Sequence, residues 1–177
     1  MKVDLILKMK VDLIGNKFLK NRRIKMLIKS KFLRRKIREV WPDISLQKIT
    51  PWDPIYWLIS EKTIGDLIEK SNVSGMDFIP QFNDCDNFAL QFQAEVRRKR
   101  YLAYKTAQEG GDIPEELRYP VAVAIAWGSM WRGMSKNHIA NLFVCREGIY
   151  LADLTPMEKR YWKADFNNDK ILNVDFR

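Results

Sequence analysis

The pattern of hydrophobic and polar positions divides the chain into a helical first part and a strand-rich second part. Between residues 21 and 40 no Gly or Pro occurs, and apolar residues recur at roughly helical spacing among basic ones; they are Ile24, Leu27, Ile28, Phe32 and Ile37. This segment predicts a basic amphipathic helix.

Further helices are predicted from start and stop signals. Asp53 followed by Pro54 is typical of an N-cap and first helical residue, so a helix is expected to start there. A second helix is predicted over residues 63–70, ended by the polar segment 71–75. A longer helix is expected to start at Asp84 and run towards residue 108, where two glycines follow.

After residue 114 the pattern changes to strands. They are predicted over Tyr119–Trp127, His138–Cys145, Ile149–Asp153 and Ile171–Phe176. Helices followed by a run of strands indicate an α+β fold with an antiparallel sheet.

Length and charge divide the chain into a body and an arm. The 177 residues suit one domain with a real core. Residues 1–41 hold 14 of the 31 Lys and Arg side chains but only three of the 22 acidic ones. We therefore expect a basic helical arm over residues 1–41 and a nearly neutral domain over residues 42–177.

The arm has several possible roles. It can be a helix that packs on the body through its apolar stripe, or a segment that covers a cleft. It can also bind nucleic acid, an anionic membrane surface or an acidic partner. The sequence does not decide among them, nor does it give the oligomeric state.

The location of the protein is predicted from what the chain lacks. Two cysteines, Cys85 and Cys145, are too few for a disulfide framework, and the charged N-terminal segment does not resemble a signal peptide. No apolar run has the roughly 20 residues that a membrane span needs. A cytoplasmic, reducing compartment is expected.

Cys85 is the candidate nucleophile. It lies in the first turn of the long predicted helix, where the partial positive charge of the helix N-terminus favours a thiolate. Asp84 and Asp86 flank it, and their charges oppose ionisation if they face the sulfur. Asp84 is expected to serve as N-cap instead.

His138, the only histidine, is the candidate base. Strand alternation places His138 and Cys145 on opposite faces, so Cys145 is expected to be a buried core residue. A tight hairpin at residues 146–148 brings Asp153 opposite a residue near Ala140 or Asn141, within reach of the imidazole. Asp153 is thus predicted to orient His138, and the order Cys, His, Asp is that of papain-like enzymes.

Three motifs carry a resemblance to known families. DCDNFAL from Asp84, HIANLFV from His138 and IYLAD from Ile149 resemble the core motifs of bacterial and phage transglutaminase-like cysteine proteinases. They are also similar to the papain-like protease domain attached to some fungal agglutinins. The resemblance covers about residues 81–176.

This resemblance implies a papain-like/transglutaminase-like core, with the nucleophile helix packed on a small antiparallel sheet. It implies Cys85 as nucleophile, His138 as general base and later acid, and Asp153 as the residue that holds the imidazole. Such families also need an oxyanion donor, for which Gln81 and Asn83 are the candidates. It leans towards a bacterial or phage host.

The remaining motifs in the sequence are weighed as a cleft loop, a calcium loop and a cofactor site. The loop at residues 128–133 between predicted strands is expected to be mobile, with Trp127 and Trp131 as apolar walls of the cleft.

Residues 165–169 begin like a calcium loop, but Lys170 stands where Gly is needed and Phe176 where Glu is needed, so a surface turn is predicted. No zinc cluster or nucleotide loop is present, so no metal or cofactor is expected.

Two functions follow as hypotheses. The first is a cysteine hydrolase, a peptidase or amidase that acts on a peptide or amide substrate through a thioester, with acyl transfer open to the same residues. The alternative is a non-catalytic binding protein on the same scaffold, whose basic arm binds nucleic acid, membrane or an acidic partner.

Overall fold

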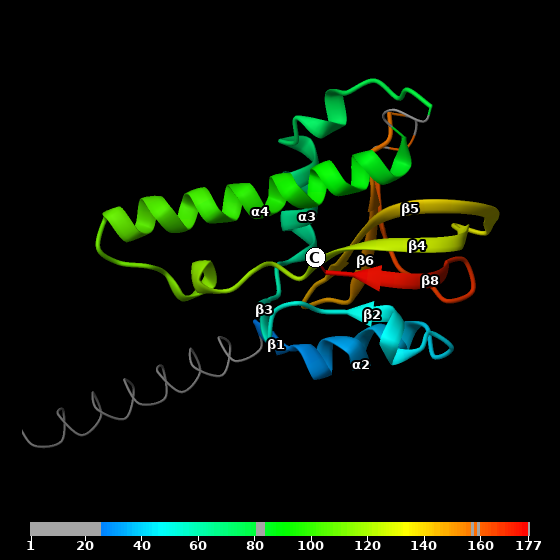
Figure 1. Cartoon of the computed structure of the whole chain (residues 1–177), viewed down its shortest axis with the longest axis horizontal. Helices are drawn as coiled ribbons and strands as arrows, with labels where there is room; N and C mark the ends of the chain where they lie inside the picture. The colour runs from blue at the N-terminus through cyan, green and yellow to red at the C-terminus, as the bar shows by residue number, and fades with distance from the viewer. Residues whose placement is uncertain (1–25, 81–83, 157, 159, 177) are drawn as a thin grey trace, which may run out of the picture.

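A computed structural model describes residues 26–80, 84–156, 158 and 160–176, and Figure 1 shows its arrangement. The helices are α2 (Ser30–Val40), α3 (Glu61–Glu69) and α4 (Cys85–Glu109), with short 3-10 turns at Leu46–Lys48, Val73–Gly75 and Glu115–Arg118. The strands are β1 (Leu27–Lys29), β2 (Ile49–Thr50), β3 (Ile55–Trp57), β4 (Val123–Trp131), β5 (Met134–Val144), β6 (Ile149–Asp153), β7 (Arg160–Lys163) and β8 (Lys170–Asp175).

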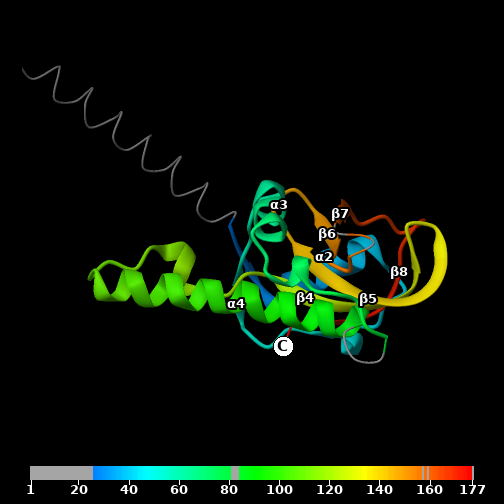
Figure 2. The same cartoon turned by 90° about the horizontal axis from the view of Figure 1, so that it is seen from above.

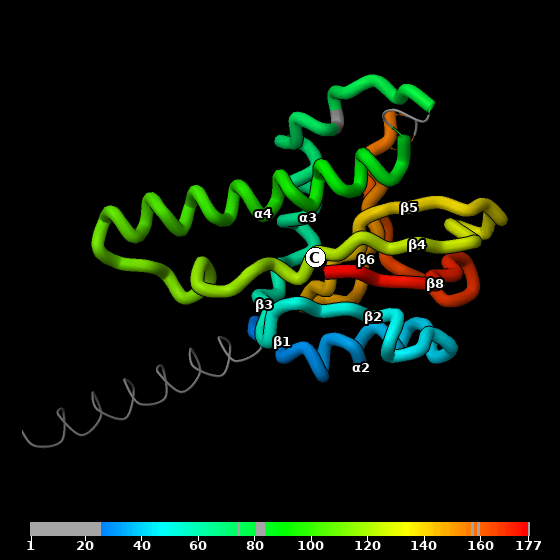
Figure 3. The backbone as a smooth tube through the Cα atoms, viewed as in Figure 1, coloured from blue at the N-terminus to red at the C-terminus, as the bar shows by residue number. Residues whose placement is uncertain are grey.

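A six-stranded sheet forms the centre, in the order β2-β8-β4-β5-β6-β7. All neighbouring strands are antiparallel except β2, which pairs in parallel with β8. Figure 3 shows how the last strand, β8, returns to lie between β4 and β2, so that the chain's final strand is an interior one. Strands β1 and β3 form a separate antiparallel pair.

Helices cover both faces of this sheet. Figures 1 and 2 show α4 along one face and α2 along the other. The alternation along β5 explains the two layers, because Leu142 and Val144 join the core on the α2 side whereas Phe143 joins the core on the α4 side. The sheet is therefore buried on both faces where these helices pack.

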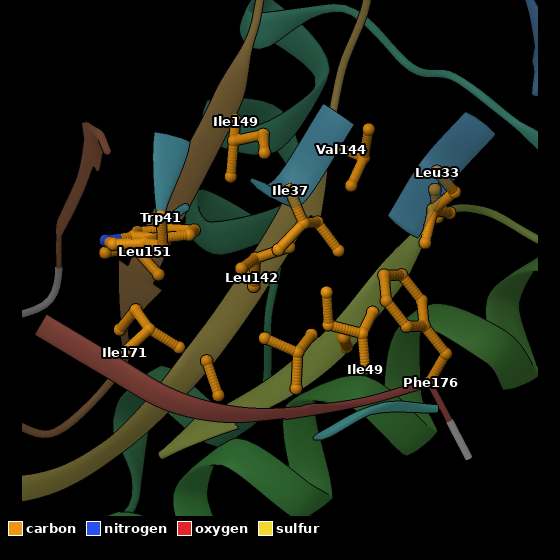
Figure 4. Close-up of a cluster of buried hydrophobic side chains, with 14 of the residues drawn as sticks. Leu33, Ile37, Trp41, Ile49, Leu142, Val144, Ile149, Leu151, Ile171 and Phe176 are labelled. Carbon is orange, nitrogen blue, oxygen red and sulfur yellow. The ribbon is translucent and has the colours of Figure 1, made fainter. Parts of the chain in front are cut away.

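The core on the α2 side is shown in Figure 4. Leu33 and Ile37, one helical turn apart, are fully buried and lie against sheet residues such as Leu142 and Ile49. Trp41 closes the same layer, and its indole Nε1 donates a hydrogen bond to the carbonyl of Asp169. This layer therefore ties the segment after residue 26 to the last strands of the chain.

The basic helix predicted over residues 21–40 is partly outside the described residues. Within them, β1 precedes a shorter helix, α2, which packs on the body through its apolar stripe. Two of its basic side chains also bond to the body: Arg34 to the carbonyl of Ile49 and Lys36 to that of Cys145. Binding of an anionic partner by residues 1–41 stays a prediction, because residues 1–25 lie outside the described part.

The helix predicted to start at Asp53 and Pro54 is wrong. Ile55–Trp57 forms β3 instead, since its β-branched and aromatic residues suit a strand and β1 supplies an antiparallel partner. The helix predicted over residues 63–70 is confirmed as α3, which Ser60 caps by accepting a hydrogen bond from the Thr63 amide. The long helix is confirmed as α4, with Asp84 at its N-cap and Gly110 at its C-cap.

All four predicted strands are present, as β4, β5, β6 and β8, and the bounds of β6 are as predicted. The loop expected at residues 128–133 is shorter, because both strands extend into it and only Arg132 and Gly133 make the positive-φ turn. His138 therefore lies within β5 and not at its start. Strands β1, β2, β3 and β7 are short and were not predicted.

The expected fold class is wrong. The sheet is neither small nor wholly antiparallel, and two helical layers enclose it. The motifs indicated a helix start and two strands, but they held no information on the pairing of β2 with β8, whose partners are more than 100 residues apart in sequence. Among the described residues, no helix is long and apolar enough to cross a membrane.

Candidate functional site

Cys85 is the first residue of α4, and its thiol is partly buried. Asp84 precedes it in an extended conformation, so the chain turns into the helix at this point. The first amide groups of a helix have no partner within it and carry partial positive charge. The partial positive charge of the helix start therefore favours an anion at Cys85.

His138 and Asp153 meet across β5 and β6. Asn141 lies opposite Ala152 in the ladder, which puts Asp153 diagonally across from His138 on the same face. The His138 Nε2 atom and the Asp153 Oδ2 atom are 2.6 Å apart. Because Asp153 occupies Nε2, the Nδ1 atom of the imidazole is the one left for Cys85.

Asp153 is itself fixed. Its side chain is 4% exposed, and its second oxygen accepts a hydrogen bond from the Thr155 amide at 2.9 Å. Burial raises the pKa of Asp153, but the hydrogen bond to His138 and the charge of the imidazole outweigh burial and lower it. Asp153 therefore stays a carboxylate that can hold a protonated imidazole.

The pKa of the Cys85 thiol is lowered, and the pKa of the His138 imidazole is raised. The hydrogen bond to His138 is the main cause that lowers the pKa of the Cys85 thiol, against the opposing effect of burial. Burial alone lowers the pKa of His138, but hydrogen bonds to Asp153 and Cys85 raise it to about 9. Both shifts favour a thiolate beside an imidazolium.

The carboxylates that flank the thiol have a smaller effect than their proximity suggests. Asp84 and Asp86 share a side-chain hydrogen bond, which lowers the pKa of Asp84 and raises that of Asp86. Among the causes that act on Cys85, the charge of Asp84 is the smallest. The two acids thus interact mainly with each other.

The structure separates the two tryptophans predicted to line the cleft. Trp127 is half-buried and lines a cleft beside the helix start. Trp131 is 1% exposed and packs edge-on against His138, with ring centroids 5.4 Å apart. Trp131 therefore supports the imidazole instead of lining the cleft.

Cys145 lies apart from the other three residues. It is fully buried in the core on the α4 side, and burial raises the pKa of its thiol to about 12. This environment is that of an inert core cysteine, as predicted from strand alternation.

The oxyanion candidates Gln81 and Asn83 lie outside the described residues.

Sequence reasoning missed three supporting residues, which are Thr155, Trp131 in its contact with His138, and Asn141. The side-chain amide of Asn141 donates to the Ala89 carbonyl at 2.9 Å and so joins β5 to α4 three residues from His138. A polar side chain on the apolar, α4-facing side of β5 was the signal that could have revealed the role of Asn141.

In the described part of the chain, no group of three or more His, Cys, Asp or Glu side chains could hold a metal ion.

Comparisons with known proteins give a likeness in fold. No protein-family model matches the chain, and no curated protein matches it. A crystal structure of Polyporus squamosus lectin bound to the human-type influenza-binding epitope Neu5Aca2-6Galb1-4GlcNAc is similar, with a TM-score of 0.60 and 16% identity over 84% of this chain. A PSL1a–E64 complex is similar, with a TM-score of 0.59, 16% identity and the same coverage. The chain spans 49% and 50% of these two chains.

These matches correct the class expected from the motifs. The fold resembles that of a structure described as a lectin, so the papain-like/transglutaminase-like fold class is wrong. The description as a papain-like or transglutaminase-like cysteine protease is corrected with it. Short motifs are a weak guide to a whole fold, because they fix a few local elements and leave the pairing of the others open.

Proposed function

We propose that the chain is a cysteine hydrolase that cleaves an amide bond through a thioester on Cys85. The observation that carries the proposal is the hydrogen-bonded series of Cys85, His138 and Asp153, in which the thiol has a lowered pKa and the imidazole a raised one. A nucleophile, its base and the group that orients the base are the parts that such chemistry needs.

The reaction follows from the positions of these groups. The Cys85 thiolate attacks the carbonyl carbon, and the oxyanion that forms can accept a hydrogen bond from the Cys85 backbone amide at the helix start. Protonated His138 gives its proton to the leaving nitrogen, the C–N bond breaks, and an amine departs. A thioester between Cys85 and the acyl group remains.

The second half of the reaction returns the site to its starting state. Neutral His138 takes a proton from water, whose oxygen attacks the thioester carbon. The C–S bond then breaks, an acid is released, and the thiolate again faces an imidazolium held by Asp153. An amine in place of water gives acyl transfer by the same steps.

The similar PSL1a structure adds support, since it was solved as a complex with E64. E64 carries an epoxide that alkylates nucleophilic thiols, so it is a suitable probe for Cys85. The test is to treat the intact protein with E64 and with iodoacetamide at pH 6, and to locate each label by peptide mass.

We expect fast labelling of Cys85, unchanged in Cys145→Ala and absent in Cys85→Ala. A Cys85 that reacts no faster than a free thiol of ordinary pKa contradicts the proposal. Equal labelling of both cysteines also contradicts it, because it shows an unfolded or non-selective site. Positive labelling justifies a search for the amide substrate.

Carbohydrate binding is the second candidate, because the similar Polyporus squamosus structure holds a glycan. A hollow of about 460 Å³ lies apart from the triad residues and is lined by Trp41, Lys170 and the half-exposed Phe166, which offers an aromatic face to a sugar. Calorimetric titration with Neu5Aca2-6Galb1-4GlcNAc tests this. Binding that is lost in Phe166→Ala supports the site, and no heat at millimolar glycan contradicts it.

A further inference from the structure

The second half of α4 runs past the edge of the sheet, as Figures 1 and 2 show. The buried residues of α4 all lie between Phe88 and Val96, and the residues from Arg97 onwards belong to neither core. Between Val96 and Gln108 the helix carries no acidic side chain and five basic ones, which are Arg97, Arg98, Lys99, Arg100 and Lys105. This half of the helix is therefore a basic segment that the packing of the sheet does not use.

A pocket of about 230 Å³ lies between this half of α4 and residues 117–121. Four side chains line it from the helix at the spacing i, i+3, i+4 and i+7 that places them on one face, namely Arg97, Arg100, Tyr101 and Tyr104. Arg118 and Tyr119 line it from the other side. Of the described residues in the lining, Asp53 is the one acidic side chain, so three guanidinium groups meet one carboxylate.

The three arginines keep donors and charge available, although each already makes a hydrogen bond. Arg100 donates through Nε and Nη2 to the Tyr119 carbonyl at 3.1 and 3.0 Å. Arg97 and Arg118 each donate one bond to a backbone carbonyl. A guanidinium has five N–H donors, and a carbonyl oxygen is uncharged, so these bonds leave the positive charge without a counter-charge. Within the described part of the chain, none of the three arginines is in an ion pair.

The protein itself satisfies these groups only in part. Burial lowers the pKa of Arg100, against the smaller effect of the Glu116 charge, which raises it. The Nε atom of Arg97 is buried and has no hydrogen-bond partner among the described residues. Buried donors and buried charges normally have partners. An anion held between these arginines would supply the counter-charge that the fold does not.

The size and the rim of the pocket narrow the class of anion. Its volume is below the range of about 300–1,000 Å³ that small-ligand sites occupy, so it suits one phosphate group and not a whole nucleotide. Tyr101 is 60% exposed at the rim, and its ring offers a flat face to an unpaired base. Arg97, Tyr101 and Lys105 follow one another at intervals of four residues, so this ring lies between two cations along the helix.

We propose that this pocket and its rim bind single-stranded nucleic acid, with one backbone phosphate between Arg97, Arg100 and Arg118 and a base stacked on Tyr101. Guanidinium groups bind phosphate oxygens through paired hydrogen bonds, and an aromatic ring stacks with any base, so the binding tolerates many sequences. A membrane surface takes up an apolar helix face, whereas this face carries arginine and tyrosine. The proposal does not depend on Cys85, which lies about 24 Å along the helix from Tyr101.

The phosphate contact is tested by fluorescence anisotropy of a labelled oligothymidylate of about ten nucleotides with the intact protein, at several salt concentrations. Arg118→Gln removes one cation at an exposed position, so we expect weaker binding and a slope of log K against log salt concentration that is shallower by about 0.7. Arg38→Gln is the matched control. Arg38 is also exposed and also donates to a backbone carbonyl, but it lies in α2 on the other face of the sheet, so its slope should equal that of the wild type.

The stacked base is tested by Tyr101→Ala. The ring is exposed, so its removal should leave the fold intact, and we expect the affinity to fall at least about fivefold with an unchanged salt slope. Tyr101→Phe keeps the ring and should keep the affinity. Leu102→Ala is the control in the same helix, because Leu102 is 51% exposed on a different face; its affinity should equal that of the wild type.

The results that would overturn the proposal are distinct. No anisotropy change at micromolar protein and low salt excludes binding of a single strand. Equal losses in Arg118→Gln and Arg38→Gln show that binding follows net charge and not the pocket, and full affinity in Tyr101→Ala excludes the stacked base. A duplex of the same length, or vesicles of anionic lipid, that bind as tightly and depend equally on Arg118 and Tyr101 exclude the single strand as the specific ligand. None of these results changes the labelling of Cys85, so the proposed function is tested separately.

Discussion

The imidazole of His138 packs edge-on against the indole of Trp131, with ring centroids 5.4 Å apart and the ring planes at 87°. Asp153 holds the imidazole through Nε2, so the indole and the carboxylate together fix its orientation. The Trp131 ring also contacts the position opposite His138 in the β4–β5 ladder, where Gly128 lies. The absence of a side chain at Gly128 is therefore part of how His138 is positioned.

Gly128→Ala tests this packing. A Cβ there would lie 2.8 Å from the Lys170 carbonyl oxygen and 2.8 Å from the Trp131 ring. Neither the ladder backbone nor the buried indole can give way easily, so we expect a loss of about 1–3 kcal/mol in the free energy of unfolding, measured by urea denaturation. Gly75→Ala is the matched control, since nothing lies within 4 Å of its Cβ position. Equal effects at both positions would contradict the packing argument.

The titration of His138 tests the contact with Asp153. The protein has one histidine, so its imidazole signals in NMR need no assignment by mutation. We expect a pKa near 9 in the wild type. Asp153→Asn removes the carboxylate that raises the pKa and leaves the burial that lowers it, so the pKa must fall. A pKa that stays near 9 in this variant shows that another group holds the proton.

The pH profile of alkylation tests the contact between Cys85 and His138. The pKa of Cys85 is lowered mainly by His138, so the thiolate is present below the usual thiol range and the rate rises through that lowered pKa. In His138→Ala the pKa of the thiol rises, and the rate at pH 6 should fall by about tenfold or more, since one pKa unit is a tenfold change in thiolate. Cys145 should stay unreactive below pH 10, because its pKa is raised to about 12. Identical profiles in the wild type and in His138→Ala would exclude a functional pair.

Helix α2 provides a test of how the N-terminal part is attached. Leu33→Ala empties a fully buried position, and we expect a loss of about 2–5 kcal/mol in the free energy of unfolding. Phe32→Ala is the control in the same helix, because Phe32 is 49% exposed; its effect should stay within about 0.5 kcal/mol. If Leu33→Ala is as mild as the control in urea denaturation, α2 does not pack on the sheet in solution.

Local sequence was sufficient for the elements that carry the candidate site. The apolar spacing and the Asp84 N-cap predicted α4, and alternation predicted β5 and β6 with His138 and Asp153 on one face. These features depend on residues close together in the chain, where helix and strand periods can be read directly. The short hairpin between β5 and β6 set their register, which brought Asp153 to His138.

Tertiary structure decided the rest. The sequence itself determined where Cys85 begins a helix, but only packing decided that β2 pairs with β8 and that α2 covers the opposite face of the sheet. It also decided that Trp131 is buried against His138 while Trp127 lines a cleft. The physical reason is distance along the chain: such contacts join residues far apart in sequence, and their free energy comes from burial that no local pattern specifies.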